Sequence, residues 1–162
     1  MATIYQSHST YIERSSNHAR TGSKVSQIAV PIGRFLFSLI FVISGINHFT
    51  SGSVAYAAAA GVPFADVLVP ISGVLALVGG ASVMLGIHAR MGALLLLLFL
   101  IPVTVMMHPF WTVSDPGEAQ VQLVNFLKNL SLIGGALFVT FYGAGPFSWD
   151  HHTQVRTVRE VG

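Results

Sequence analysis

The chain contains four long apolar stretches that carry almost no charge: Ile28–Ile46, Val67–Leu85, Met91–Met107 and Val124–Tyr142. An α-helix rises about 1.5 Å per residue and the hydrocarbon core of a bilayer is about 30 Å thick, so each stretch is nearly long enough to cross once. Backbone groups in hydrocarbon must be satisfied within the protein, and continuous apolar runs favour helices over a barrel. The sequence predicts an all-α membrane protein, a four-transmembrane-helix up-down bundle with helices at about 28–48, 66–86, 90–108 and 123–143.

Composition supports this fold class and excludes several functions. Hydrophobic residues make up 52% of the chain and charged residues 9%, whereas about a quarter of the residues in a soluble domain are charged. The absence of cysteine excludes disulfides, thiolate metal sites and cysteine nucleophiles. A nucleic-acid-binding protein would need a clustered basic face, which this sequence lacks. We expect the lipid bilayer as a partner, and a bundle at 27–150 between a disordered cytoplasmic tail at 1–26 and a second cytoplasmic tail at 151–162.

The basic residues predict the orientation. Those outside the long apolar segments lie in the two tails and the short second connection: Arg14, Arg20, Lys24, Arg90, Arg156 and Arg159. The first and third connections contain no Lys or Arg but carry Asp66, Asp115 and Glu118. Because cytoplasmic loops are enriched in Lys and Arg, both termini should face the cytoplasm of a bacterial inner membrane. We expect structural roles for Arg34 and Arg90, which open the two halves of a weak internal repeat.

Helical phase predicts a polar lining at the outer end of the bundle. On the first helix Arg34, Ser38, Phe41, Gly45 and His48 fall within an arc of about 80°, at 100° per residue. Leu94–Leu98 of the third helix should face lipid. Polar side chains from all four helices are expected at the outer end: His48, Asp66, Thr104, His108, Asn125, Lys128 and Asn129.

This polar cluster has two interpretations. Lys128 should find an acceptor at membrane depth, and Asp66 is the predicted partner. The cluster then either holds the helices together or lines a ligand-binding cavity. Haem or another metal between His48 and His108 is not favoured, because both histidines lie at helix ends, and Met106 and Met107 suit packing better than copper binding.

Short motifs in consistent order resemble the DoxX family of small four-helix membrane proteins. They are Gly33-Arg34, Ser44-Gly45, His48-Phe49, Gly61-Val62-Pro63, Val78-Gly79-Gly80, Leu85-Gly86, Ala89-Arg90, His108-Pro109-Phe110-Trp111, Phe126-Leu127-Lys128-Asn129-Leu130 and Gly134-Gly135. The resemblance covers about residues 28–150 and implies a four-helix bundle associated with quinone-linked membrane oxidoreductases. Many DoxX-like proteins carry a Glu three positions before the first glycine of the second-helix pair, or close to it. Here that segment reads Ala76-Leu77-Val78-Gly79-Gly80, which argues against a proton relay or metal site there.

The leading functional interpretation is a non-catalytic binding or accessory subunit. Its outer cavity would hold a small polar or quinone-like head group and support a membrane redox partner, because Lys128, the two asparagines and a neutral histidine can donate hydrogen bonds to a quinone carbonyl. A structural scaffold without a ligand and a small-solute carrier acting as a homo-oligomer are the alternatives. The sequence contains no phosphate-binding loop, nucleotide fingerprint or Ser-His-Asp elbow.

Overall fold

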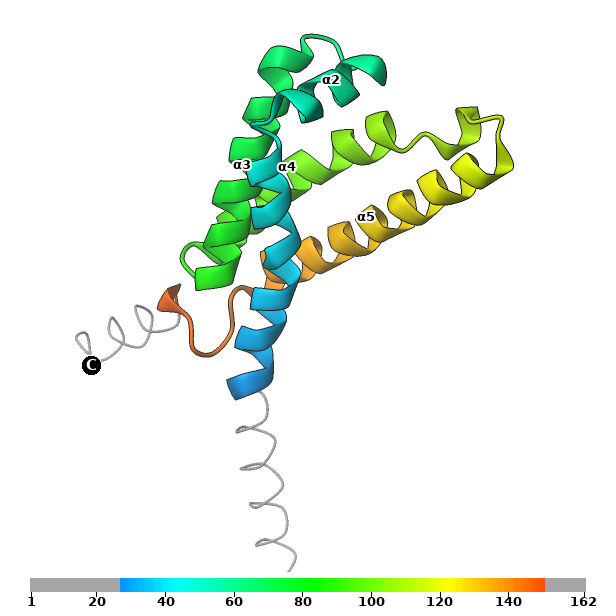
Figure 1. Cartoon of the computed structure of the whole chain (residues 1–162). Coiled ribbons are helices and arrows are strands. Elements are labelled where there is room, and N and C mark those ends of the chain that lie inside the picture. Colours follow the sequence, from blue (N-terminus) through cyan, green and yellow to red (C-terminus); the bar gives the residue numbers. More distant parts are fainter. Residues whose placement is uncertain (1–26, 151–162) are drawn as a thin grey trace, which may run out of the picture.

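A computed structural model describes residues 27–150 as helices and short connections, with no strand in that range (Figure 1). Four helices are long and apolar enough to cross a membrane: the N-terminal helix Gln27–Asn47, α3 at Ala65–Leu85, α4 at Ala89–Met107 and α5 at Pro116–Tyr142. The prediction of an all-α protein with four membrane-spanning helices is confirmed. The tails predicted at 1–26 and 151–162 lie outside the described residues.

A short helix, α2 at Ser51–Ala59, lies in the first connection, where the sequence reading placed no helix. Thr50 caps it by accepting a hydrogen bond from the Ser53 backbone N–H at 3.3 Å. Ala57 of α2 is buried against Ala65 and Val69 of α3. The helix therefore lies across one end of the bundle, as Figure 1 shows.

Helix α5 starts seven residues before the predicted position 123, because polar residues form its first two turns. The Asp115 side chain accepts a hydrogen bond from the Glu118 backbone N–H at 2.8 Å, and Pro116 occupies the first turn, where its missing N–H costs nothing. At about 1.5 Å per residue, the 27 residues of α5 span about 40 Å. Lys128 is consequently near the middle of this helix rather than one turn inside it.

The long helices pack where small residues let backbones approach closely. A Cβ added at Gly79 of α3 would lie 2.8 Å from the Gly92 carbonyl oxygen of α4, and one added at Gly45 would lie 2.9 Å from the Gly73 carbonyl oxygen of α3. Small residues at membrane helix interfaces permit this approach. The prediction that one stripe of the first helix faces inward is confirmed, since Arg34, Ser38, Phe41 and Gly45 are buried and His48 is half-buried.

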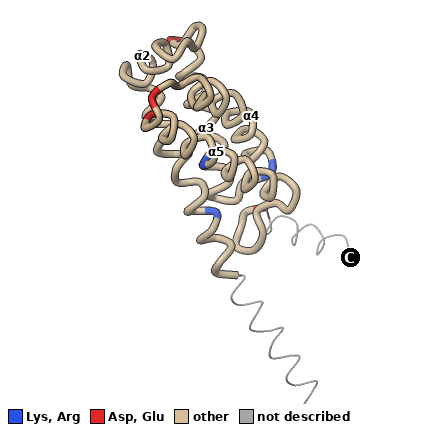
Figure 2. The backbone as a smooth tube through the Cα atoms, turned by 90° about the vertical axis from the view of Figure 1, so that its right-hand side faces the viewer, with Lys and Arg blue, Asp and Glu red and all other residues tan. Residues whose placement is uncertain are grey.

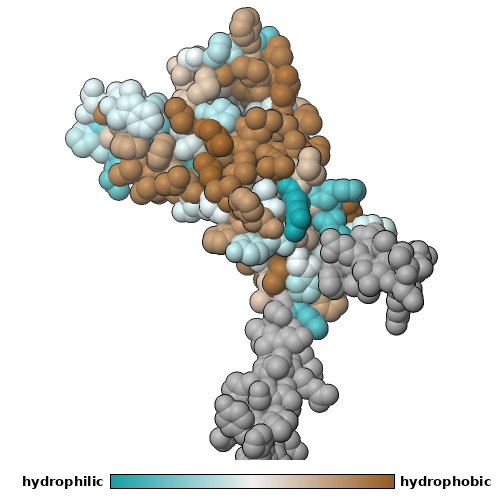
Figure 3. Space-filling model, turned by 180° about the vertical axis from the view of Figure 1, so that it is seen from behind, coloured by the Kyte–Doolittle hydropathy of each residue, from teal (hydrophilic) through white to brown (hydrophobic). Residues whose placement is uncertain are grey.

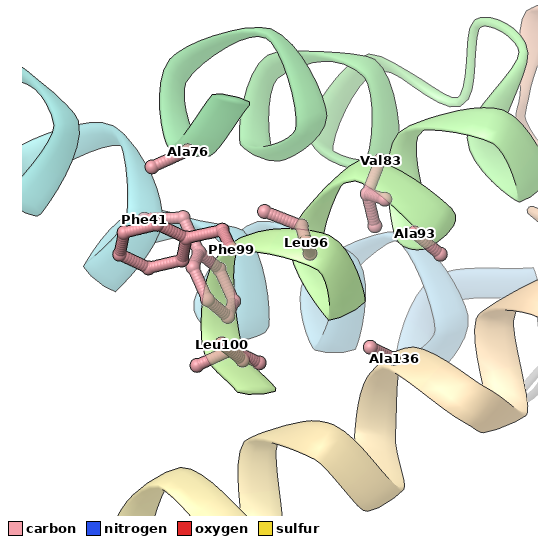
Figure 4. Packing of buried hydrophobic residues seen from close by; sticks show 8 residues of the cluster. All are labelled: Phe41, Ala76, Val83, Ala93, Leu96, Phe99, Leu100 and Ala136. Atoms are coloured by element: carbon pink, nitrogen blue, oxygen red, sulfur yellow. The ribbon is translucent and has the colours of Figure 1, made fainter. Parts of the chain in front are cut away.

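The apolar core lies between these helices (Figure 4), and its buried members are Phe41, Ala76, Val83, Ala93, Leu96, Phe99, Leu100 and Ala136. Leu96 is fully buried, whereas Leu94 and Leu98 are exposed. The prediction that the whole Leu94–Leu98 run faces lipid is therefore wrong for Leu96, because a five-residue run turns through more than one full helical turn. The surface in view in Figure 3 is largely hydrophobic, as contact with lipid requires.

The end of the bundle opposite α2 is closed by the segment after α5. Arg34 donates hydrogen bonds to the carbonyl oxygens of Ala144, at 2.7 Å, and Phe147, at 2.8 Å. The Asp150 carboxylate accepts from the backbone N–H groups of His88, at 2.7 Å, and Ala89, at 2.9 Å, so it caps the start of α4. Figure 1 shows this segment passing between the N-terminal helix and α3. We call the contacts of residues 143–150 the C-terminal clasp.

Gly86 is one position where the clasp requires glycine. It adopts a φ of +68° at the end of α3, and an added Cβ would lie 2.7 Å from the Arg34 Nη1 atom. A side chain would therefore be strained and would displace the arginine. Arg90, the other arginine predicted to be structural, is exposed and lies beside Gly143, whose added Cβ would be 3.3 Å from Arg90 Nε.

We predict that Gly79→Val destabilises the bundle and that Gly134→Val does not. Both glycines begin a Gly-Gly pair, but a Cβ at Gly79 meets the Gly92 backbone and Leu96, whereas a Cβ at Gly134 has no heavy atom within 4 Å. Overpacking typically costs about 1–3 kcal/mol, so Gly79→Val should lower the melting temperature by several degrees in thermal unfolding of the detergent-solubilised protein. Equal melting temperatures for the two variants would contradict this packing.

Candidate functional site

A cavity of about 1220 Å³ opens between the N-terminal helix, α2, α3 and α4, and α5 contributes Lys128, Asn129 and Leu132 to its wall. Figure 1 shows α4 and α5 running away from the N-terminal helix and α3 toward the end that α2 covers. Most of the wall is apolar and includes Leu75, Phe99 and Val103. Pockets for small ligands typically measure about 300–1,000 Å³, so this cavity exceeds the volume that a drug-sized ligand needs.

His48 closes the N-terminal helix and lines the cavity. Its Nδ1 lies 2.6 Å from the Ser44 carbonyl oxygen, and its ring packs edge-on against Phe99 with the ring centres 5.6 Å apart. Because a carbonyl oxygen can only accept, Nδ1 must carry the hydrogen. In the neutral ring Nε2 is then a hydrogen-bond acceptor.

His108 lines the same cavity from the end of α4. Its Nδ1 lies 2.8 Å from Gln122 Oε1, a partner on α5 that the sequence reading missed. With that oxygen as the acceptor, Nδ1 again carries the hydrogen and Nε2 is left to accept. The structure thus brings both histidines to one cavity, each with its ring fixed through Nδ1.

Asn129 is a buried polar residue at the cavity wall, whereas the fully enclosed atoms without a partner, Arg34 Nε and Ser38 Oγ, belong to residues outside this wall. The Asn129 side chain is 5% exposed and lines the cavity, and it has no hydrogen-bond partner among residues 27–150. A buried amide without a partner typically costs about 1–3 kcal/mol. A group inside the cavity that bonds this carboxamide would remove that cost.

Lys128 precedes Asn129 and also lines the cavity. Its Nζ donates to Asn125 Oδ1 at 3.0 Å, and Asn125 Nδ2 donates to the Val121 carbonyl oxygen at 3.1 Å. The predicted Asp66 partner is not observed: Asp66 is exposed in the first turn of α3, does not line the cavity, and forms no ion pair with Lys128. A charge at the centre of a membrane helix costs about 2.5–3.5 kcal/mol on insertion scales, and here only a neutral amide offsets it.

Four of the seven predicted site residues line the cavity, and three do not. The lining residues are His48, His108, Lys128 and Asn129. Thr104 is buried and donates to the Leu100 carbonyl oxygen at 2.6 Å, Asn125 supports Lys128, and Asp66 lies outside. The helical phase of each helix taken alone could not distinguish residues that line the cavity from residues that do not, because it contains no information on how the helices are tilted against one another.

Sequence reasoning also missed several lining residues. Asn47, Thr50, Ser53 and Tyr56 reach the cavity because α2 folds back over it. The Thr50-x-x-Ser53 spacing is a helix-capping signal that could have revealed α2. Met106 and Met107 line the wall, and residues 27–150 contain no group of three or more His, Asp or Glu side chains placed to hold a metal ion.

We predict that Lys128 is energetically coupled to Asn125 and not to Asp66. In a double-mutant cycle, Lys128→Met with Asp66→Asn should be additive within about 0.3–0.5 kcal/mol, whereas Lys128→Met with Asn125→Leu should deviate by more than that. Thermal unfolding of the purified variants measures both cycles. Coupling to Asp66 with additivity at Asn125 would contradict the observed hydrogen bond.

Comparison with known proteins corrects the family resemblance inferred from the motifs. The model of the SURF4 family matches residues 9–155, so the resemblance to the DoxX family is wrong. The quinone ligand and redox partner that it implied lose their basis. Short motifs dispersed over apolar helices were therefore not specific enough to identify the family.

Two curated relatives from Escherichia coli strain K12 are similar over most of the chain. Inner membrane protein YphA is 28% identical over 121 residues, which cover 74% of this chain and 86% of YphA. Inner membrane protein YqjF is 29% identical over 129 residues, which cover 78% of this chain and 93% of YqjF. No solved structure matches the chain. With a family model that spans nearly its whole length, this membrane protein belongs to the SURF4 family.

Proposed function

We propose that this protein binds an amphiphilic molecule of the bilayer, non-covalently, in the cavity beside α2. The observation that carries the proposal is the Asn129 carboxamide, which is 5% exposed, lines a cavity of about 1220 Å³ and lacks a hydrogen-bond partner among the described residues. A group that only held helices together would bond its neighbours. A ligand head group would satisfy this amide and explain why a buried polar side chain is left open.

The arrangement of the cavity matches a molecule with a polar head and an apolar tail. Polar side chains come from the end of the N-terminal helix, from α2 and from α5, whereas Leu75, Phe99 and Val103 belong to the apolar wall. A tail can lie along this wall while the head reaches Asn129 and the histidines. No Asp or Glu lines the cavity, so its wall offers no carboxylate as a general acid, a general base or a metal ligand.

The proposed location is the bacterial inner membrane, with both termini in the cytoplasm and α2 on the outer side. The names of the two relatives support the membrane, and the distribution of Lys and Arg supports the orientation. In Figure 2 the acidic residues in view lie at the end marked by α2, and the Lys and Arg residues lie away from it. The cavity would then be reached from the outer leaflet.

We predict that Asn129→Leu weakens amphiphile binding and that Ser131→Leu does not. Both variants replace a polar residue of α5 by leucine, but Ser131 is exposed, bonds the Leu127 carbonyl oxygen at 3.0 Å and does not line the cavity. Lysophosphatidylcholine with a photoactivatable diazirine in its tail should crosslink the wild-type protein at Leu75 or Phe99. Crosslinking there should fall several-fold in Asn129→Leu, because the leucine cannot bond the head group.

The result that would overturn this function is labelling of the wild-type protein only on outward-facing residues such as Phe138 and Phe141, which are exposed on α5. The protein would then be a scaffold whose polar cluster has no ligand. Circular dichroism and a monodisperse elution profile establish that both variants are folded.

The orientation predicts the location of reporter fusions. Fusions at residues 55 and 115 should report the periplasm, and a fusion at the C-terminus should report the cytoplasm, because Arg90 and the basic tails stay on the cytoplasmic side. Fusing alkaline phosphatase and, separately, green fluorescent protein at each position measures on which side of the membrane that position lies. A periplasmic C-terminus would contradict the proposed orientation and place the cavity in the inner leaflet.

A further inference from the structure

We propose that the head group bound in this cavity is anionic and that Lys128 is its charge partner. The inference rests on the proposed amphiphile binding and adds the chemical class of the ligand. It follows from the charge balance of the cavity wall, from the depth of Lys128 along α5 and from the hydrogen-bonding capacity left on Lys128 and Asn129.

The wall of the cavity carries an uncompensated positive charge. Its charged member is Lys128, and no Asp or Glu lies among its lining residues. Asp66, the carboxylate predicted to pair with Lys128, lies outside the cavity and forms no ion pair with Lys128. Lys128 is exposed at this wall and its charge is not neutralised by a lining carboxylate, so an anion is the ligand class that its charge favours.

The position of Lys128 makes this charge unusual for a structural side chain. It lies twelve residues after Pro116 and fourteen before Tyr142, so at about 1.5 Å per residue it is about 18 Å and about 21 Å from the two ends of α5. Lysines that only mark a membrane boundary lie near helix ends, where the side chain reaches the interface. A lysine at mid-helix facing a cavity is typical of a ligand or substrate pathway.

Hydrogen-bond donors remain available at the same point. The Lys128 ammonium has three N–H donors, of which the bond to Asn125 uses one, and the Asn129 amide adds two that are not used within the described residues. Two successive residues of α5 at the cavity wall thus retain unused donors. Phosphate and carboxylate oxygens are acceptors, and charge-assisted bonds to them are about twice as strong as neutral ones.

The rest of the wall indicates that the anion is part of an amphiphile. A free phosphate ion would need donors on several sides, whereas much of this wall is apolar, including Leu132 of α5 one turn after Lys128. The two histidine Nε2 atoms are acceptors when the rings are neutral, and they suit a hydroxyl of the same ligand. A single-chain phospholipid such as lysophosphatidate has these three parts: an acidic phosphate, a glycerol hydroxyl and a tail.

The test compares two lysolipids with the same fluorescent acyl chain and different heads. Lysophosphatidate carries a net negative charge, whereas lysophosphatidylcholine is zwitterionic. Because the acyl chain is the same, its contribution to the two affinities cancels in their ratio. Both are titrated into the purified full-length protein in a non-ionic detergent. We expect the wild-type protein to bind lysophosphatidate at least about tenfold more tightly, as charge-assisted hydrogen bonds imply.

The matched variants assign that preference to Lys128. Lys128→Met removes the charge while keeping a flexible apolar stem, and it should reduce the affinity ratio to near one. Lys128→Arg should retain the preference. Arg90→Met removes a cation that lies outside the cavity beside Gly143, and it should leave the ratio unchanged.

Each remaining outcome has a defined meaning. Equal affinities of the wild-type protein for the two lysolipids would overturn the anionic head group. A preference for lysophosphatidate that survives Lys128→Met would overturn Lys128 as the charge partner. Both results would leave amphiphile binding intact. Absence of binding for both lysolipids would overturn the proposed function itself. Displacement of lysophosphatidate by equimolar inorganic phosphate would show that the tail contributes nothing, and would replace the lipid by a soluble anion.

Discussion

The close contact between α3 and α4 is the interaction on which the rest of the structure depends. Gly79 and Gly92 let the two backbones approach until an added Cβ would lie 2.8 Å from a carbonyl oxygen. In lipid there is no hydrophobic gain from bringing helices together, so dispersion contacts at such close approaches provide much of the attraction. The N-terminal helix then crosses α3 at Gly45 and Gly73, and α5 follows α4. Since α4 and α5 diverge from the other pair beyond this contact, the cavity is a direct result of where the small residues lie.

The fold was largely predictable because each long helix carries its own signal. Hydropathy located four spans, and a period of 100° per residue identified the buried stripe that contains Arg34, Ser38, Phe41 and Gly45. The short helix α2 was not predictable from hydropathy, because its Ala57 is buried only through contact with α3. The early start of α5 depends on the Asp115 cap, which a search for apolar residues does not register.

The candidate site was predicted less completely, because it depends on relations between helices. Sequence phase indicated that His48, His108, Lys128 and Asn129 share an end and a face, and they do line one cavity. The pairing of Lys128 with Asp66 failed because Asp66 lies at the very start of α3 and Lys128 lies mid-helix on α5. The actual partners, Asn125 for Lys128 and Gln122 for His108, are set by local spacing and by the tilt of α5 against α4.

The C-terminal clasp makes the two ends of the bundle mechanically unequal. Arg34 and Asp150 tie the last described segment to the N-terminal helix and to the start of α4, so a relative movement of the helices must break charge-assisted hydrogen bonds at that end. At the α2 end, the described residues form no hydrogen bond that joins the N-terminal helix, α2 or α3 to α4 or α5. The clasp therefore restrains that end of the bundle more strongly than the α2 end is restrained. Under the proposed function, entry of a ligand at the α2 end would connect the cavity with one leaflet, so the lipid composition of that leaflet, rather than the average composition of the membrane, would determine what occupies the cavity.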